Sequence, residues 1–470
     1  MSCDQNQPLG QDFTAVSLLK FAFPTMVTMV FMGLYTIGDT IVVSRFVSTD
    51  ALSAVNIVTP VINLIVGLGS MLAMGGGAVI GRTLGEGRGE EASREFTLLL
   101  CFGVALGSLI AGAGTLFCGE IIRGLGSGSL LFPYCQAYLS VLLLFTPAGI
   151  LQVMFQNWMI TAGRPGLGMA LSVGSGAANV LLDLMFVGKL HMGIAGSALG
   201  TGIGYLISTA AGAAFFLRDR GGLRFRKPSF HVGVLAESCA NGCSELISQA
   251  AAAVTTFLFN RVMMELSGED GVAAVTIMIY SQFLLTALYI GFSMGVSPVL
   301  SYNFGAQNHR QLKRMMKICL TFIVAVSAFI FTASMISGPA LIAAFSPAGT
   351  PVYEIAAEGF PVFSLSFLFC GVNIFASAAF TALSDGKTSA LISFLRTFGL
   401  IVLFLTILPD VLGVKGVWLA VPAAELGAMA VSVFCLFEGQ RAFCLKTGQL
   451  NITVQMYPCS EGTDTGSPAL

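Results

Sequence analysis

Charged residues are scarce in this chain of 470 residues. Asp, Glu, Lys and Arg together make up 10% of it, whereas 55% of the residues are hydrophobic. A soluble domain usually carries about 25% charged residues, so this chain has too few charges to cover a water-facing surface of its size. The net charge of -1 gives no field that would attract nucleic acid. The composition predicts a protein of the lipid bilayer, with no nucleic-acid partner.

Motifs for metal, disulfide and nucleotide binding are also missing. The 11 cysteines are scattered without a CxxC pair or zinc-ligand spacing. An integral-membrane enzyme would need a His/Asp metal cluster or a Ser/His pair at one depth, but the three histidines, His191, His231 and His309, fall in expected loops. A P-loop motif is absent, so ATP is not the direct source of energy. We expect no enzyme, no catalytic residue, no resident metal and no cofactor.

Long apolar runs dominate the chain instead, with a mean hydropathy of +0.84. A membrane-spanning helix needs roughly 20 apolar residues. The runs are continuously apolar rather than alternating, which excludes transmembrane strands. We therefore predict an all-α integral membrane protein with twelve transmembrane helices, at 20–43, 52–79, 95–118, 132–160, 166–188, 193–217, 237–263, 272–300, 316–338, 353–382, 387–409 and 413–437.

The basic residues indicate how these helices are oriented. Most of the 23 Lys and Arg residues fall in loops on one side of the membrane, including a basic run at 218–227. The positive-inside rule places that side, and both termini, in the cytoplasm. The expected organisation is an N-terminal cytoplasmic segment (1–19), an N-lobe (20–217), a basic cytoplasmic linker (218–236), a C-lobe (237–437) and a partly disordered cytoplasmic tail (438–470).

A self-match at one fixed offset indicates an internal duplication. Asp50–Ile57 lies over Asp270–Ile277, and Gly193 lies over Gly413 in the same register. The repeated unit holds six helices, an even number, so both copies insert the same way round. The two lobes are then related by a pseudo-two-fold axis along the membrane normal. Two similar bundles facing a central cleft suit a transporter that works by alternating access, whereas a channel would repeat its unit around a pore.

Acidic and polar side chains at membrane depth are functional candidates by default. Asp39 and Asp183 lie six residues before the outer ends of two outward-running spans, roughly 9 Å inside the membrane at 1.5 Å per residue. Asn179 shares a helix face with Asp183, and Thr201 falls at comparable depth. Desolvated carboxylates can carry protons, and this set of oxygens can also bind a hard cation such as Na⁺. These four residues form the predicted cation-coupling layer.

The C-lobe carries a different set of charges. Glu245, Arg396 and Glu425 all fall in the inner half of their spans. They form either a structural ion pair or a second coupling or substrate site, and the sequence leaves both open. The two lobes are therefore expected to be chemically specialised.

A few uncharged residues complete the candidate list. Gln156, Asn157 and Gln282 either line the cleft or form hydrogen bonds between helices. Pro24 removes a backbone hydrogen bond early in the first span and predicts a place where that helix bends.

Several of these features occur together in one known transporter family. They are the two six-helix halves, Pro24 and Asp39 in the first span, the Gly85–Arg94 loop with its copy at Gly305–Arg314, the Phe155–Pro165 stretch, and Asn179 with Asp183. Over residues 15–440 the chain resembles the multidrug and toxic compound extrusion (MATE) family, prokaryotic type.

The resemblance implies export of amphipathic, often cationic, compounds in exchange for inward H⁺ or Na⁺. It further implies a cation site of a span-one Asp, a span-five Asn and Asp, and a span-six Thr. These correspond to Asp39, Asn179, Asp183 and Thr201, and cation binding there would change the packing of the first span around Pro24. Other members couple through the C-lobe, where Glu245 resembles their span-seven acid. We also expect one chain to be the functional unit, in a bacterial inner membrane. A lipid-linked saccharide flippase of the same superfamily is the main alternative, and a channel is a weaker one.

Overall fold

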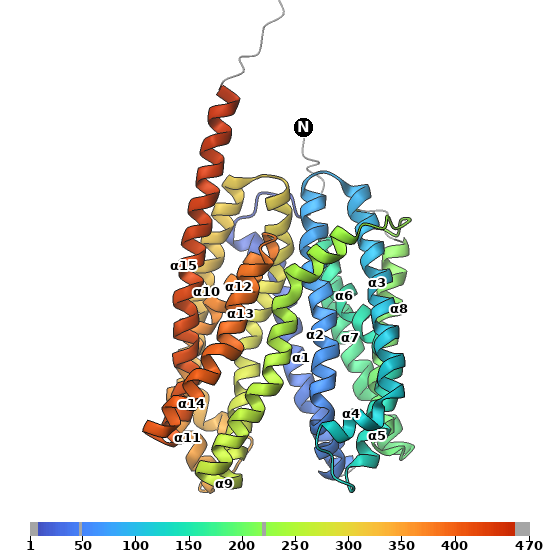
Figure 1. The fold of residues 1–470 in the computed structure, drawn as a ribbon, viewed down its shortest axis with the longest axis vertical. Helices are drawn as coiled ribbons and strands as arrows, with labels where there is room; N and C mark the ends of the chain where they lie inside the picture. The colour runs from blue at the N-terminus through green and yellow to red at the C-terminus, as the bar shows by residue number, and fades with distance from the viewer. Residues whose placement is uncertain (1–7, 47–48, 219–221, 456–470) are drawn as a thin grey trace, which may run out of the picture.

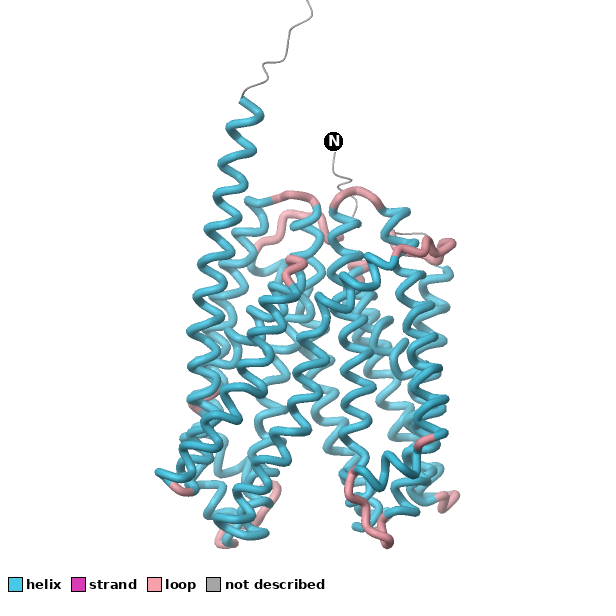
Figure 2. The backbone as a smooth tube through the Cα atoms, viewed as in Figure 1, coloured by secondary structure: helices cyan, strands magenta, loops and turns pink. Residues whose placement is uncertain are grey.

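The computed structural model describes residues 8–46, 49–218 and 222–455, and the side chains in these ranges except those of 37–49, 52 and 439–455. The end of the predicted tail, from 456, lies outside the described residues. Every regular element in the described ranges is helical (Figure 2). The first half holds α1 (Ala15–Phe46), α2 (Thr49–Gly85), α3 (Gly89–Leu116), α4 (Cys118–Gly124), α5 (Phe132–Leu144), α6 (Thr146–Thr161), α7 (Pro165–Asp183), the π-helix η1 (Leu184–Lys189) and α8 (Gly193–Arg218).

The second half has a similar order, with α9 in the place of α1 and α2 and, among the described residues, no helix in the place of α4. It holds α9 (Val232–Gly305), α10 (His309–Ala343), α11 (Pro351–Ser364), α12 (Phe367–Ala382), α13 (Gly386–Phe394), the π-helix η2 (Leu395–Gly399), α14 (Leu400–Leu412) and α15 (Val414–Gln455).

Twelve membrane crossings follow from these helices. In the described ranges, nine helices are long and apolar enough to cross a bilayer, and two bent pairs, α5–α6 and α11–α12, pass the same test as single spans. The 74-residue α9 is broken at Gly268 (φ 64°, ψ -151°), so it provides two crossings rather than one. The nine helices, the two bent pairs and the additional crossing of α9 add up to twelve crossings. This confirms the predicted all-α architecture with twelve transmembrane helices.

The duplication is visible in the backbone as well as in the sequence. The α5–α6 span bends by 57° at Phe145, and the α11–α12 span bends by 55° at Leu365, the matching position of the second copy. A left-handed backbone at Gly193 (φ 61°) recurs at Gly413 (φ 59°), which is also the matching position. The same local geometry at the same offset indicates two copies of one folding unit.

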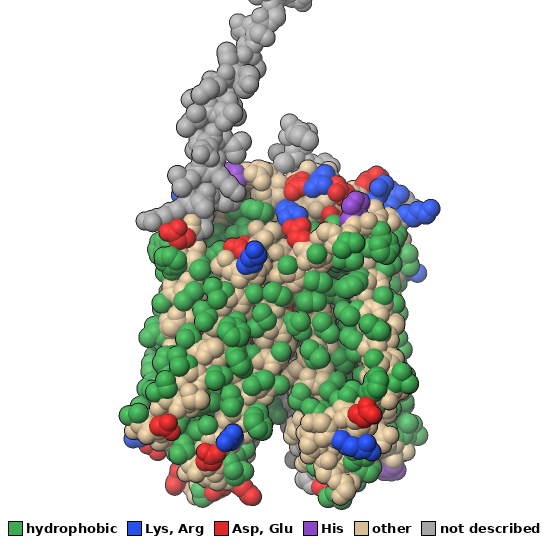
Figure 3. Space-filling view, viewed as in Figure 1, with side chains coloured by type: hydrophobic (Ala, Val, Ile, Leu, Met, Phe, Trp, Pro, Cys, Tyr) green, Lys and Arg blue, Asp and Glu red, His purple; other side chains and the backbone are tan. Residues whose placement is uncertain are grey.

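The two copies form two lobes that diverge like an inverted V (Figures 1 and 2). Helices α1–α8 make up the N-lobe and α9–α15 the C-lobe. We call the end that carries Pro8 and the α2–α3, α6–α7 and α12–α13 loops the closed end, because the lobes meet there. At the opposite, open end, the molecular surface is notched between the lobes (Figure 3).

Close helix packing explains why the closed end is shut. Gly75 of α2 lies against the backbone of Ser238, and Gly242 of α9 lies against the carbonyl of Met71, so neither glycine has room for a Cβ. Further towards this end, Gly85 and Gly305 contact each other's helices in the same way. Glycines permit this approach because they lack a side chain. We call these contacts the glycine seam.

An ion pair caps the glycine seam. Arg82 of α2 binds Glu237 of α9 in a bidentate pair, with N···O distances of 2.5 and 3.0 Å. Its Nη1 also donates to the Ser384 hydroxyl over 3.1 Å. Bidentate arginine pairs are geometrically specific. This group therefore links the N-lobe to two segments of the C-lobe at the closed end.

Candidate functional site

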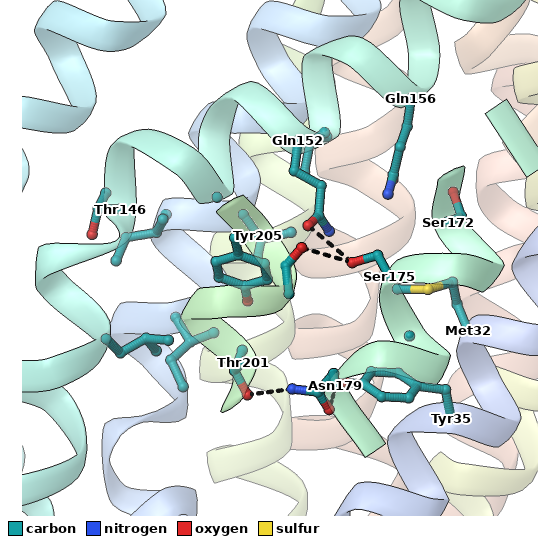
Figure 4. A pocket seen from close by; sticks show the side chains of 18 residues that line it. Met32, Tyr35, Thr146, Gln152, Gln156, Ser172, Ser175, Asn179, Thr201 and Tyr205 are labelled. Carbon is teal, nitrogen blue, oxygen red and sulfur yellow. Dashed lines mark hydrogen bonds between the residues drawn. The ribbon is translucent and has the colours of Figure 1, made fainter. Parts of the chain in front are cut away.

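A cavity of about 170 Å³ lies inside the N-lobe, among α1, α2 and α5–α8 (Figure 4). Apolar and aromatic side chains share its wall with amides and hydroxyls, which is typical of small-molecule sites. Its lining residues include Met32, Tyr35, Ile65, Gln152, Gln156, Ser175, Asn179, Thr201 and Tyr205. Two of the predicted coupling residues, Asn179 and Thr201, are therefore on the wall of one cavity.

The amide of Asn179 is the centre of the polar contacts in this cavity. As drawn in Figure 4, its Nδ2 donates to Thr201 Oγ1 over 3.1 Å, and its Oδ1 accepts from the Tyr35 hydroxyl over 2.6 Å. When the amide nitrogen and oxygen exchange places, the nitrogen donates to the Tyr35 oxygen and to Asp183 Oδ2 (3.2 Å), and the oxygen accepts from the backbone N–H of Thr201 (2.9 Å). The flipped amide satisfies groups from α1, α7 and α8, so it is the expected orientation.

Asp183 lies behind Asn179, at the end of α7. The residue is only 1% exposed, and Gly200 of α8 packs so closely on its carboxylate that a Cβ there would collide with it. The π-helix η1 begins at the next residue. Such widened turns often occur at functional sites. The structure therefore brings Asp183, Asn179 and Thr201 together.

Asp39 was predicted to belong to the same layer. Its position is on α1, which packs against α7, but its side chain lies outside the described part of the structure. Among the described side chains, no group of three or more His, Cys, Asp or Glu residues could hold a metal ion. The oxygens of described side chains that lie together here are those of Asp183, Asn179 and Thr201.

Gln156 and Asn157 lie towards the closed end of the N-lobe. Gln156 lines the main cavity and also a second one of about 30 Å³, which Asn157, Thr25 and Met294 help to line. The Gln156 side-chain nitrogen has no hydrogen-bond partner among the described residues, whereas Asn157 Nδ2 donates to the carbonyl of Val153 over 2.9 Å. Gln156 is therefore the better placed of the two to meet a ligand.

Pro24 and Gln282 have less distinctive surroundings. Pro24 lies within α1, and its carbonyl accepts a hydrogen bond from the Thr28 hydroxyl over 2.9 Å. The α1 backbone just after Pro24 touches Gly291 of α9, so a bend at Pro24 would disturb a contact between the lobes. Gln282 lies on α9 and is half-buried, and it lines neither of the cavities described above.

The C-lobe charges form a buried cluster. Arg396 in η2 pairs with Glu425 in α15, with an Nη2–Oε1 distance of 2.9 Å. Asn373 Nδ2 donates to Glu425 Oε2 over 2.7 Å, and its Oδ1 accepts from the Ser432 hydroxyl over 2.8 Å. Half-buried Glu245 lies within electrostatic range of Arg396 but forms no ion pair among the described residues. The ion pair between Arg396 and Glu425 is therefore formed, and a coupling or substrate role for these residues stays a prediction.

Several cavity residues were not predicted. Tyr35, Tyr205, Gln152 and Ser175 all line the N-lobe cavity, and the Ser175 hydroxyl donates to the carbonyl of Gly204 over 3.0 Å. One signal was available for α7. Ser172, Ser175, Asn179 and Asp183 lie three or four residues apart, so they follow one face of the helix. A polar stripe within an apolar span marks a buried or cavity-lining face.

Comparisons with known proteins agree with this architecture. The MatE family model matches twice, over residues 24–185 and 246–407, and so covers both lobes. A multidrug export protein MepA of Staphylococcus haemolyticus is 22% identical over 426 residues, which are 90% of this chain and 93% of that protein.

Solved structures share the fold. A multidrug resistance MATE family transporter in an outward-facing conformation superposes with a TM-score of 0.88 at 21% identity, covering 95% of this chain and 100% of that one. A transporter of the MOP superfamily from Pyrococcus furiosus superposes with a TM-score of 0.86 at 20% identity, covering 94% of this chain and 99% of that one. Because the family model matches more than half of the sequence, in both lobes, the chain belongs to the MatE family.

Proposed function

We propose that this protein is a cation-coupled antiporter that exports amphipathic, often cationic, compounds by alternating access of its two lobes. The observation that carries the proposal is the buried Asp183, which lies behind Asn179, while Asn179 and Thr201 line the cavity of about 170 Å³. A buried carboxylate gains or loses charge as it binds a cation. The name of the similar staphylococcal protein, a multidrug export protein, supports export as the direction.

The cavity favours amphipathic cargo. Met32, Tyr35, Ile65 and Tyr205 offer apolar and aromatic surface, while Gln152 and the other amides can orient a polar group. Among the described residues that line the cavity, none is Lys or Arg. The lining therefore favours cationic or neutral compounds over the anionic pyrophosphate of a lipid-linked saccharide.

The coupling mechanism follows from the contacts of Asn179. H⁺ or Na⁺ at Asp39 and Asp183 would remove negative charge next to an amide that also binds Tyr35 of α1 and Thr201 of α8. The change would reach α1, which contacts α9 just beyond Pro24. Cation binding in the N-lobe and the position of the C-lobe are coupled in this way.

We further propose that the closed end faces the cytoplasm of a bacterial inner membrane, with both termini on that side, and that one chain is the functional unit. The loops at this end carry the basic residues that the positive-inside rule assigns to the cytoplasm. The described conformation would then be open to the outside.

Dye efflux tests the proposal. Everted membrane vesicles with the wild type should accumulate a cationic dye when a proton or a sodium gradient is imposed, and the gradient that works identifies the coupling ion. Asp39→Asn should abolish both dye transport and drug resistance in cells while expression is preserved, because the amide cannot change charge. Full resistance in that variant would contradict the assignment of the site.

Thr201→Val tests the cavity independently of the carboxylates. The valine keeps the shape but removes the hydroxyl bonded to Asn179, so we expect transport to fall roughly tenfold, as one lost hydrogen bond of about 1.4 kcal/mol implies. Thr209→Val, two turns along α8, is the matched control: its hydroxyl bonds to the carbonyl of Ala148 over 2.9 Å, away from the cavity. Equal efflux rates in the two variants would argue against a role for Thr201.

A further inference from the structure

The chain before α1 is irregular but ordered against the protein. We call Pro8–Thr14 the N-terminal strap. Leu9 is 1% exposed and Phe13 is 0% exposed, whereas Gln11 and Asp12 between them face solvent. A segment without regular structure that buries two large apolar side chains is held by tertiary packing. The strap is therefore packed against the rest of the protein at the closed end.

The C-lobe supplies polar and aromatic contacts to the strap. Asn303 Nδ2 donates to the carbonyl of Leu9 over 3.5 Å, and Gln311 Nε2 donates to the carbonyl of Phe13 over 3.4 Å. Gly10 packs on the ring of Tyr302, so close that a Cβ on Gly10 would lie 3.1 Å from the tyrosine hydroxyl oxygen. Asn303 and Gln311 are themselves buried. The strap thus lies on the end of α9 and the start of α10.

The N-lobe holds the other side of the strap. Gly163, in the loop between α6 and α7, has a left-handed backbone (φ 77°), and a Cβ on it would lie 2.7 Å from the Cβ of Pro8. Phe13 also packs edge-on against Phe21 of α1, with ring centroids 5.8 Å apart. A single short segment therefore contacts both lobes next to the glycine seam.

We infer that the N-terminal strap is a latch that stabilises the conformation in which the closed end is shut. When the lobes separate at this end, Gly163 of the N-lobe must move away from Tyr302 and Gln311 of the C-lobe, and the strap, which contacts all three, cannot follow both lobes. The strap must then detach from one lobe before the closed end can open. This inference rests on the alternating access proposed above but not on the identity of the cargo or the cation.

Hydrogen–deuterium exchange of the full chain in lipid nanodiscs tests the latch without any substrate. In the double variant Leu9→Ser, Phe13→Ser we expect peptides from residues 75–88 and 298–312 to exchange about tenfold faster or more, as loss of two buried apolar side chains implies. The matched control, Gln11→Ser with Asp12→Ser, changes only exposed side chains of the strap and should exchange like the wild type. Unchanged exchange at both peptides in the first variant would overturn the inference.

Cross-linking gives a second test that does not depend on removing the apolar anchors. Gln11→Cys and Gln307→Cys replace exposed side chains on the strap and just beyond the end of α9. A short, reductively cleavable bismaleimide joining them should block dye transport, and cleavage should restore it. Each single variant, treated with the same reagent, should keep transporting. A cross-linked protein that transports at the rate of the untreated double variant would show that the strap need not detach.

Discussion

Gly242→Ala is expected to abolish transport while leaving each lobe folded. In the glycine seam, Gly242 of α9 lies against the carbonyl of Met71 in α2, and a Cβ there would overlap that oxygen. The obstacle is backbone on both sides, so no side chain can rotate away to make room. Overpacking costs about 1–3 kcal/mol, a population shift of roughly five- to 150-fold. A rigid contact belongs at the upper end of this range, so the lobes should no longer close at this end.

Gly233→Ala is the matched control for this prediction. Gly233 is in the same helix, and a Cβ on it would meet nothing within 4 Å. Dye efflux and the elution profile of both variants in detergent should be measured together. We expect Gly233→Ala to behave like the wild type and Gly242→Ala to elute normally but not transport. Efflux by Gly242→Ala at the wild-type rate would show that the seam does not need to close as tightly as described.

The large-scale fold was predictable because it depends on averaged properties of the sequence. Apolar length alone gives twelve crossings, and the repeat that aligns Gly193 with Gly413 reappears as a repeated left-handed turn. The bends at Phe145 and Leu365 were not foreseen, although the same repeat relates them. A bend depends on a few local hydrogen bonds, and hydropathy averaged over a whole span gives no information about them.

The residues of the candidate site were predictable only where their depth in the membrane determines which side chains lie close together. Asn179, Asp183 and Thr201 could be placed in one layer by counting residues along their spans, and they do meet. Tyr35 and Tyr205 were missed because depth does not show which way a side chain faces when every face of a span is apolar. The π-helix after Asp183 changes the direction in which the side chains of the last turn point. The pattern of apolar residues in the sequence does not reveal this π-helix.

Contacts between the lobes were the least predictable. Gly75 and Gly242 are two of 55 glycines, and nothing local distinguishes them from glycines that pack within one lobe. Arg82 is one of 23 Lys and Arg residues in the sequence, but it binds Glu237 across the seam, 155 residues away. Such contacts join segments that are far apart in the sequence, so no local pattern in the sequence specifies them.

The second large effect is expected from the buried ion pair of the C-lobe. Arg396→Met should lower the free energy of unfolding by about 3–5 kcal/mol, because it leaves the Glu425 carboxylate buried without a counter-charge. The side chain of Glu425 is 3% exposed, so water cannot take the place of the guanidinium. Asn373 supplies one neutral hydrogen bond to the carboxylate. That bond offsets only part of the loss of a charged partner.

A double-mutant cycle identifies the cause. Glu425→Gln in the Arg396→Met background removes the unpaired charge and keeps an oxygen for Asn373, so most of the lost stability should return. Lys415→Met is the control from the same lobe: its ion pair with Glu358 spans 3.3 Å, but the two side chains are 73% and 65% exposed. Exposed pairs contribute roughly 0–1 kcal/mol. Thermal and denaturant unfolding in detergent should therefore separate Arg396→Met clearly from Lys415→Met. If the two variants unfold at the same temperature and denaturant concentration, the Arg396–Glu425 pair does not stabilise the C-lobe. Arg396 would then be a candidate for a role in transport together with Glu245.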